Sequence, residues 1–159
     1  MRLRITLSVA ALCAATVLGS AALASGQEEG GPEPLFAELS GANELTPQGQ
    51  RGAGDDNGRG SFSLTFDGGK ICFGLTVANI GKPLAAHIHK GGPKVSGDIV
   101  VDLKNYPAGG NPGASSGCVS ARRALRRAIQ RHPGRYYVNV HTKAYPAGAI
   151  RGQLAAEEY

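Results

Sequence analysis

Three histidines have spacings that could place their imidazole rings around one metal ion. His87 and His89 are two residues apart, and His141 follows Asn139 at the same spacing in the later run YYVNVHT, 136–142. Side chains alternate between the two faces of a strand, so each pair lies on one face of its strand. If the two strands are neighbours, His87, His89 and His141 could converge as three nitrogen ligands suited to copper or zinc.

A second interpretation of these histidines needs no metal. Their ring nitrogens would hydrogen-bond to nearby loops and fix the hairpins, or lie solvated on the outer face of the sheet. The H-x-H spacing is compatible with both interpretations. The sequence therefore leaves two alternatives, one without a cofactor and one with copper as the candidate cofactor.

The two histidine-containing segments resemble each other. AHIH at 86–89 is followed by SGDI at 96–99, and VNVH at 138–141 is followed by AGAI at 147–150. Both copies read as a strand, a loop with Gly and Pro, and a second strand. We expect two related hairpin-like units within one domain, because a solenoid needs three or more repeats.

The cysteines predict one disulfide. Cys13 lies in the apolar N-terminal run and is expected to leave with it, so Cys72 and Cys118 remain as an even pair in an exported chain. Such a pair favours a disulfide over a metal site or a catalytic thiol. The link would stabilise the fold by about 3–4 kcal/mol on the chain-entropy model.

One segment has the pattern of a short basic helix. Ser120 is the expected N-cap, Ala121, Leu125, Ala128 and Ile129 form an apolar face, and His132-Pro133-Gly134 stops the helix. The opposite face carries Arg122, Arg123, Arg126, Arg127 and Arg131, with Arg135 just beyond. This face could bind a polyanion or could simply be solvated. No aromatic residue interleaves the arginines to stack bases, which argues against nucleic acid.

The elements that must position these residues are mainly strands. Residues 35–39 read as a strand, and 61–66 and 71–77 alternate apolar and polar side chains around the turn Asp67-Gly68-Gly69, which predicts a hairpin. The 24 glycines among 159 residues favour a turn-rich β protein over a helical bundle. The predicted fold is an antiparallel β-sandwich of about seven or eight strands with one short helix.

The N-terminus reads as a secretory signal over residues 1–24, with Arg2 and Arg4, an apolar run at 7–18 and ALA at 22–24. A flexible leader follows at 25–34, then the domain at 35–155 and a tail at 156–159. No second apolar run is long enough to span a bilayer after cleavage. Cleavage would remove Arg2 and Arg4 and lower the formal net charge from +5 to +3, so the mature chain is only mildly basic. We expect a single-domain protein that is exported, either secreted or kept in the periplasm or cell envelope, with an extracellular or envelope partner.

Common enzyme signatures are missing from the sequence. It contains no G-x-S-x-G nucleophile elbow, no H-E-x-x-H and no phosphate-binding loop. We therefore assign no catalytic residue and expect a protein that is not an enzyme.

Several motifs together resemble the CHRD domain, the module named after chordin and found in many exported bacterial proteins. They are LSGANE at 39–44, AHIHKG at 86–91, YYVNVHT at 136–142 and YPAGAIRGQL at 145–154. The resemblance spans about residues 35–155. It implies a β-sandwich-like extracellular module, without carrying over chordin's role as a growth-factor antagonist.

A weaker resemblance is to the Cu/Zn superoxide dismutases, which are Greek-key sandwiches related in architecture to the immunoglobulin fold. Their copper ligands include an H-x-H pair on one strand and a late-strand His, and His87, His89 and His141 occupy similar places. The zinc loop has no counterpart between His89 and Cys118. The resemblances therefore favour a non-enzymatic binding or structural module, with copper binding or polyanion binding as the alternatives.

Overall fold

The computed structural model describes residues 32–156. The predicted signal peptide at 1–24 and most of the predicted leader lie outside the described residues, as do residues 157–159. The strands are β1 (Leu35–Ser40), β2 (Arg59–Asp67), β3 (Lys70–Ala78), β4 (Pro83–Lys90), β5 (Ile99–Asp102), β6 (Gly113–Ser120), β7 (Tyr136–Thr142), β8 (Ile150–Gln153) and β9 (Ala155–Ala156). The helices are α1 (Arg123–Arg131) and the short 3₁₀ turns η1 (Gly41–Asn43) and η2 (Pro133–Arg135).

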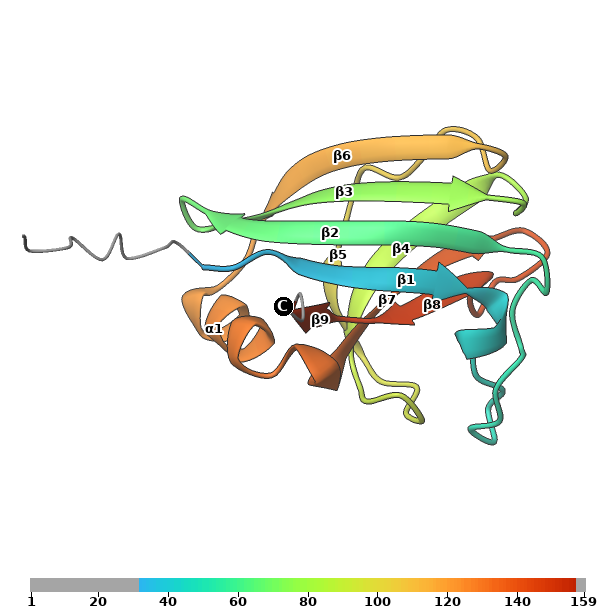
Figure 1. Cartoon of the computed structure of the whole chain (residues 1–159), viewed down its shortest axis with the longest axis horizontal. Coiled ribbons are helices and arrows are strands. Elements are labelled where there is room, and N and C mark those ends of the chain that lie inside the picture. Colours follow the sequence, from blue (N-terminus) through green and yellow to red (C-terminus); the bar gives the residue numbers. More distant parts are fainter. Residues whose placement is uncertain (1–31, 157–159) are drawn as a thin grey trace, which may run out of the picture.

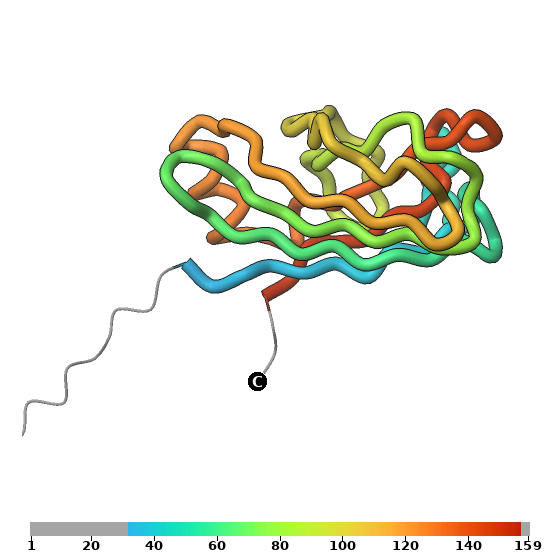
Figure 2. The backbone as a smooth tube through the Cα atoms, turned by 90° about the horizontal axis from the view of Figure 1, so that it is seen from above, coloured from blue at the N-terminus to red at the C-terminus, as the bar shows by residue number. Residues whose placement is uncertain are grey.

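All strand pairs of this part of the chain are antiparallel and belong to one nearly closed sheet. The order across it is β5-β4-β7-β8-β1-β2-β3-β6, and β9 adds to β1 through the pair Leu35 and Ala156. Between the halves β5-β4-β7-β8 and β1-β2-β3-β6, strand β1 pairs with β8 at Ser40 and Arg151, and the sheet folds over at that junction. Figures 1 and 2 show the resulting two layers. The prediction of a mainly β, antiparallel, sandwich-like fold is confirmed.

The expected hairpin is β2 and β3. Phe62, Leu64, Leu75 and Val77 are buried on one face, as their period of two predicts. The strands stay in register down to the pair Asp67 and Lys70. Gly68 and Gly69 make the turn at φ values of 47° and 91°, which residues other than glycine rarely adopt.

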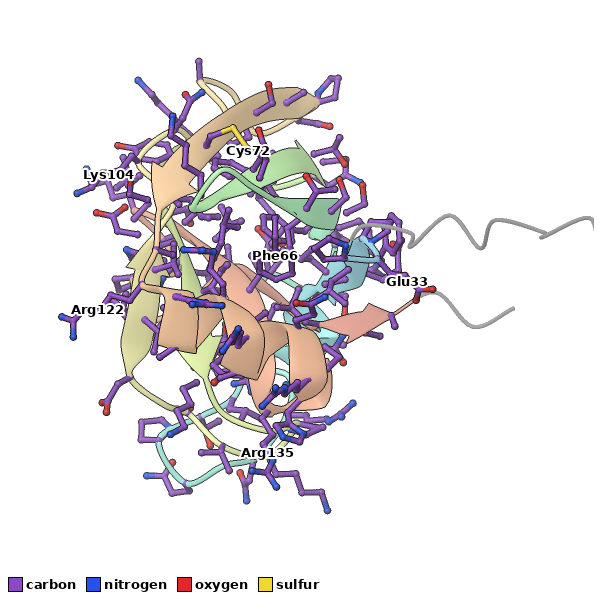
Figure 3. All side chains as sticks on the ribbon, turned by 90° about the vertical axis from the view of Figure 1, so that its left-hand side faces the viewer. Glu33, Phe66, Cys72, Lys104, Arg122 and Arg135 are labelled. Carbon is purple, nitrogen blue, oxygen red and sulfur yellow. A yellow bond between two sulfur atoms is a disulfide. The ribbon has the colours of Figure 1, made fainter. Side chains whose placement is uncertain are left out.

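The disulfide between Cys72 and Cys118 is present, as predicted. The two residues face each other across β3 and β6, with Cα atoms 4.0 Å apart and a sequence separation of 46. Figure 3 shows the bond beside the label of Cys72. Because β6 is one end of the sheet that residues 32–156 form, the disulfide anchors an edge strand to its neighbour β3.

Helix α1 lies against one end of the sheet (Figure 1), with its apolar face inward as predicted. Ile129 is fully buried, and Leu125 and Ala128 pack against the core. The expected N-cap is wrong, because Ser120 is still in β6, paired with Lys70, and the helix begins after Arg122. Among the described residues, no helix is long and apolar enough to cross a membrane.

Candidate metal centre

The three candidate histidines come from two neighbouring strands. β4 carries His87 and His89, and β7 beside it carries His141, so the two similar segments pair with each other. The residues that alternate with the histidines along the two strands point into the core. These residues are Ala86, Ile88, Val138 and Val140, and each is 0% exposed. The histidines therefore share the outer face of this half of the sheet, as their parity predicts.

The three side chains converge. One nitrogen atom from each of His87, His89 and His141 lies within 4.8 Å of the others. Nδ1 of His87 is 3.0 Å from Nε2 of His141. Metal–nitrogen bonds of about 2.0–2.1 Å separate ligand nitrogens by roughly 3–3.5 Å. Small rotations of the rings would therefore let one ion contact all three.

Loop carbonyls fix the tautomers of two of these rings. Nδ1 of His89 is 2.8 Å from the carbonyl oxygen of Gly97, and Nδ1 of His141 is 2.9 Å from that of Pro146. A carbonyl only accepts hydrogen bonds, so each neutral ring carries its proton on Nδ1 and its lone pair on Nε2. Metal-binding histidines are commonly oriented in this way by a backbone carbonyl on the second nitrogen.

The Nε2 atom of His89 is the least satisfied nitrogen of the cluster. His89 is only 7% exposed, and its Nε2 has no hydrogen-bond partner. Buried polar atoms nearly always have a partner, and an unpaired one costs free energy. The loop-bonding interpretation explains Nδ1 of this ring, but it leaves Nε2 without a role.

Electrostatics favour the neutral forms of His87 and His89 near pH 7. Burial lowers the pKa of His87, and the neighbouring His141 and His89 lower it further, against an opposing effect of Asp102. Burial also lowers the pKa of His89, although its bond to Gly97 and the nearby side chain of Asn139 oppose the shift. Neutral imidazole is the form that binds metal ions, so the rings of His87 and His89 need not lose a net proton before binding near neutral pH.

An aromatic and cationic stack lies behind His89. The ring of Tyr137 stacks on His89 with centroids 4.7 Å apart, and the guanidinium of Arg151 lies 3.4 Å from the centroid of Tyr137. Nη2 of Arg151 donates to the carbonyls of Gly92 and Val95, and the Tyr137 hydroxyl accepts from the backbone N–H of Gly97. These bonds hold the loop between β4 and β5 against the outer face of the sheet.

A buried ion pair completes this layer. Nη1 of Arg151 is 3.9 Å from Oε1 of Glu44, and the two side chains are 2% and 4% exposed. Burial lowers the pKa of Arg151, opposed by Tyr137 and Glu44. Gly148 has φ 150° and leaves room for Glu44, whose Oε2 would lie 2.0 Å from a Cβ atom at that position.

Sequence reasoning identified the three histidines but missed Tyr137, Arg151 and Glu44. Strand parity could have found the first two. Tyr137 lies two residues before Asn139, and Arg151 follows the inward-facing Ile150. Glu44 comes from the loop after β1, and no local pattern places it beside Arg151.

The basic residues predicted to form a polyanion-binding face lie elsewhere, on and just before α1. Arg123, Arg127 and Arg131 are exposed on the helix, and Arg122 precedes it. Figure 3 shows Arg122 and Arg135 pointing away from the ribbon. Arg126 differs from the others because its Nη1 donates to the carbonyls of Gly69 and Ala121. That side chain ties the helix to the β2–β3 turn.

Comparison with known proteins gives one match. The family model described as the CHRD domain matches residues 35–154, which include every residue of the histidine cluster and of the stack behind it. No curated protein and no solved structure matches the chain.

Proposed function

The chain belongs to the CHRD domain family, and from that premise we propose that it is an exported metal-binding domain that holds a copper ion between His87, His89 and His141. The family supports a small domain protein with a binding or structural role. The disulfide is compatible with an extracellular setting, where such bonds persist.

The observation that carries the proposal is that the two nitrogens of a histidine ring have different partners. His89 and His141 each donate Nδ1–H to a loop carbonyl. Nε2 of His141 then accepts a hydrogen bond from Nδ1 of His87, whereas the buried Nε2 of His89 has no partner. A metal ion would bind the lone pair of His89 together with those of the other two rings, in place of the hydrogen bond between them.

Copper is favoured by the donor set. Three neutral nitrogens suit copper, zinc, iron and nickel, and among divalent ions a given site of this kind binds Cu²⁺ most tightly. None of the three clustered side chains is a carboxylate, the ligand that magnesium, calcium or manganese prefers. We propose binding without turnover, because the sequence has no counterpart of the dismutase zinc loop.

The test is a calorimetric titration of the purified chain with Cu²⁺ and, separately, Zn²⁺. The variant His87→Ala/His89→Ala/His141→Ala removes the cluster, and His132→Ala is the matched control because His132, the fourth histidine, lies at the end of α1. We expect one tightly bound Cu²⁺ per chain in the parent and the control, and none in the triple variant.

Three results would contradict this proposal in whole or in part. If the folded parent binds no metal, or if the triple variant binds as well as the parent, the cluster is not a metal site. If the parent binds Zn²⁺ more tightly than Cu²⁺, the site remains but the choice of copper is wrong. Near-ultraviolet circular dichroism of each variant establishes that the fold is intact, and His89→Asn serves as a milder variant if the triple one unfolds.

A further inference from the structure

A row of exposed arginines follows the outer side of α1. Arg123, Arg127 and Arg131 are spaced four residues apart, and all three are exposed. At 1.5 Å per residue, their positions repeat about every 6 Å along the helix axis. The row therefore presents a regular series of positive charges to solvent.

These charges have no counterpart within the described residues. The ion pairs found there within 4.0 Å are Lys104–Asp102 and Arg151–Glu44, and neither involves α1. Like charges four residues apart destabilise a helix. The row is therefore unfavourable for the helix itself, and a bound anion would relieve the repulsion.

A hollow lies at the start of the row. It has a volume of about 290 Å³ between α1 and the β2–β3 turn, and Arg123, Arg127, Gln130 and Phe66 contribute to its walls. Asp67 also lines it, without forming an ion pair with either arginine. The hollow combines three guanidinium groups, a neutral amide and an apolar ring, and the guanidinium of Arg126 is already bonded to backbone carbonyls. Such a lining suits a polar unit that carries negative charge.

The surroundings of the row restrict the class of polyanion. The apolar side of α1 is covered by the core, since Ile129 is fully buried and Leu125 is partly buried. A helix that lies in a membrane surface needs that side free. None of the nine residues of α1 is aromatic, so the helix offers no platform for the successive stacked bases of a single-stranded nucleic acid.

We propose that α1 binds a linear acidic polysaccharide, with one charged sugar in the hollow and the following charges along Arg127 and Arg131. The guanidinium groups would pair with carboxylate or sulfate groups, and Gln130 would bond to sugar hydroxyls. This surface is separate from the histidine cluster, so it does not depend on metal binding.

The test measures binding of the purified chain to heparin and to polygalacturonate over a range of salt concentrations. The variant Arg123→Gln/Arg127→Gln/Arg131→Gln removes the row. Lys82→Gln/Lys94→Gln/Lys143→Gln is the matched control, because it removes the same charge from exposed positions outside the helix. A single-stranded oligonucleotide and anionic vesicles serve as competing polyanions.

We expect at least one polysaccharide to bind the parent and the lysine control equally, and about tenfold or more weaker binding to the arginine variant. The salt slope of log K should be roughly −2 to −3 for three contacts, by analogy with phosphate polymers. If the arginine and lysine variants lose the same amount of affinity, binding depends only on the net charge of the protein, and the proposal is overturned. No binding to either polysaccharide, or tighter binding to the oligonucleotide or vesicles, would also overturn it.

Discussion

Individual side chains of the outer face do two jobs at once. His89 and His141 each bond to a loop through Nδ1, while Nε2 faces the cluster. The hydrogen bonds that shape the hairpins therefore also place the lone pairs of these two rings on Nε2, facing the cluster. The two interpretations of the histidines, loop fixing and metal binding, are compatible because they use different nitrogens.

The pH dependence of stability follows from the neutral histidines. The pKa values of His87 and His89 are lowered in the folded state, so below about pH 6.5 the unfolded chain binds more protons than the folded one. Stability of the metal-free protein should be fully present above about pH 6.5 and should fall as the pH drops towards the folded-state pKa values. His141, Asp102, Lys104 and Glu44 are the other ionisable groups that act on these two rings.

Urea unfolding between pH 5 and pH 8 in the presence of a chelator measures this dependence. The variant His87→Asn/His89→Asn should show a flatter profile between pH 5 and 6.5, because the titrating groups are gone. An identical slope in the two proteins would show that other groups determine the acid sensitivity.

Arg151 should be among the costliest polar residues to replace. Its Nη2 satisfies the carbonyls of Gly92 and Val95, and its charge faces the buried Glu44. Removing one member of a buried ion pair costs about 3–5 kcal/mol, because the other charge is left uncompensated. Arg151→Gln should lose about that much stability in denaturant unfolding and should speed hydrogen exchange in the loop between β4 and β5.

The double variant Glu44→Gln/Arg151→Gln separates the effect of an unpaired buried charge from the effect of the altered side-chain shape. It should be less destabilised than the sum of the two single variants, since neither charge remains unpaired. If Arg151→Gln alone stays within about 1 kcal/mol of the parent, the stack behind His89 does not hold the loop as described.

At the scale of elements, the disulfide secures an edge of the sheet. In the part of the chain that the structure describes, β6 pairs with β3 alone, and Cys72 and Cys118 link the two strands. Replacing both cysteines by alanine should lower the free energy of unfolding by about 3–4 kcal/mol, since 46 residues separate the linked positions. Comparison of the variant with the parent, oxidised and then reduced, by denaturant unfolding checks the value. A reduced parent as stable as the oxidised one would contradict it.

Local sequence patterns predicted which helices and strands form better than they predicted the residues at which these elements begin and end. The alternation of Phe62 and Leu64 with polar residues, and the glycines of the turn, were sufficient for the β2–β3 hairpin. The apolar face of α1 was also correct. Ser120 was misread as an N-cap because its local preference loses to the pairing of β6 with β3, a contact with a distant segment.

At the scale of the whole molecule, the order of the strands could not be read from the sequence. Strand parity put the three histidines on matching faces, but only the pairing of β4 with β7 brings them together. The junction of β1 and β8 at Ser40 and Arg151 places Glu44 near the stack, and it depends on the folding of the entire chain. Long-range pairing of this kind has no local signature.

Metal binding should stabilise the molecule as a whole. A ligand that binds only the folded state adds about 2.7 kcal/mol at a free concentration of 100 times its Kd. For a domain of this size we expect a rise in Tm of roughly 10 °C. Differential scanning fluorimetry with and without Cu²⁺ checks this, and His132→Ala should shift as the parent does. A rise of the same size in the variant without the cluster would place the stabilising ion elsewhere.

The pairing of β9 with β1 brings the two ends of the domain together. Leu35 and Ala156 are direct partners, and opposed Cα atoms in an antiparallel pair are about 4.5–5.5 Å apart. A segment that enters at Leu35 and one that leaves after Ala156 therefore start side by side. A domain with adjacent ends can be inserted between two neighbouring residues in a surface loop of a larger protein, with little disturbance to the fold of that protein.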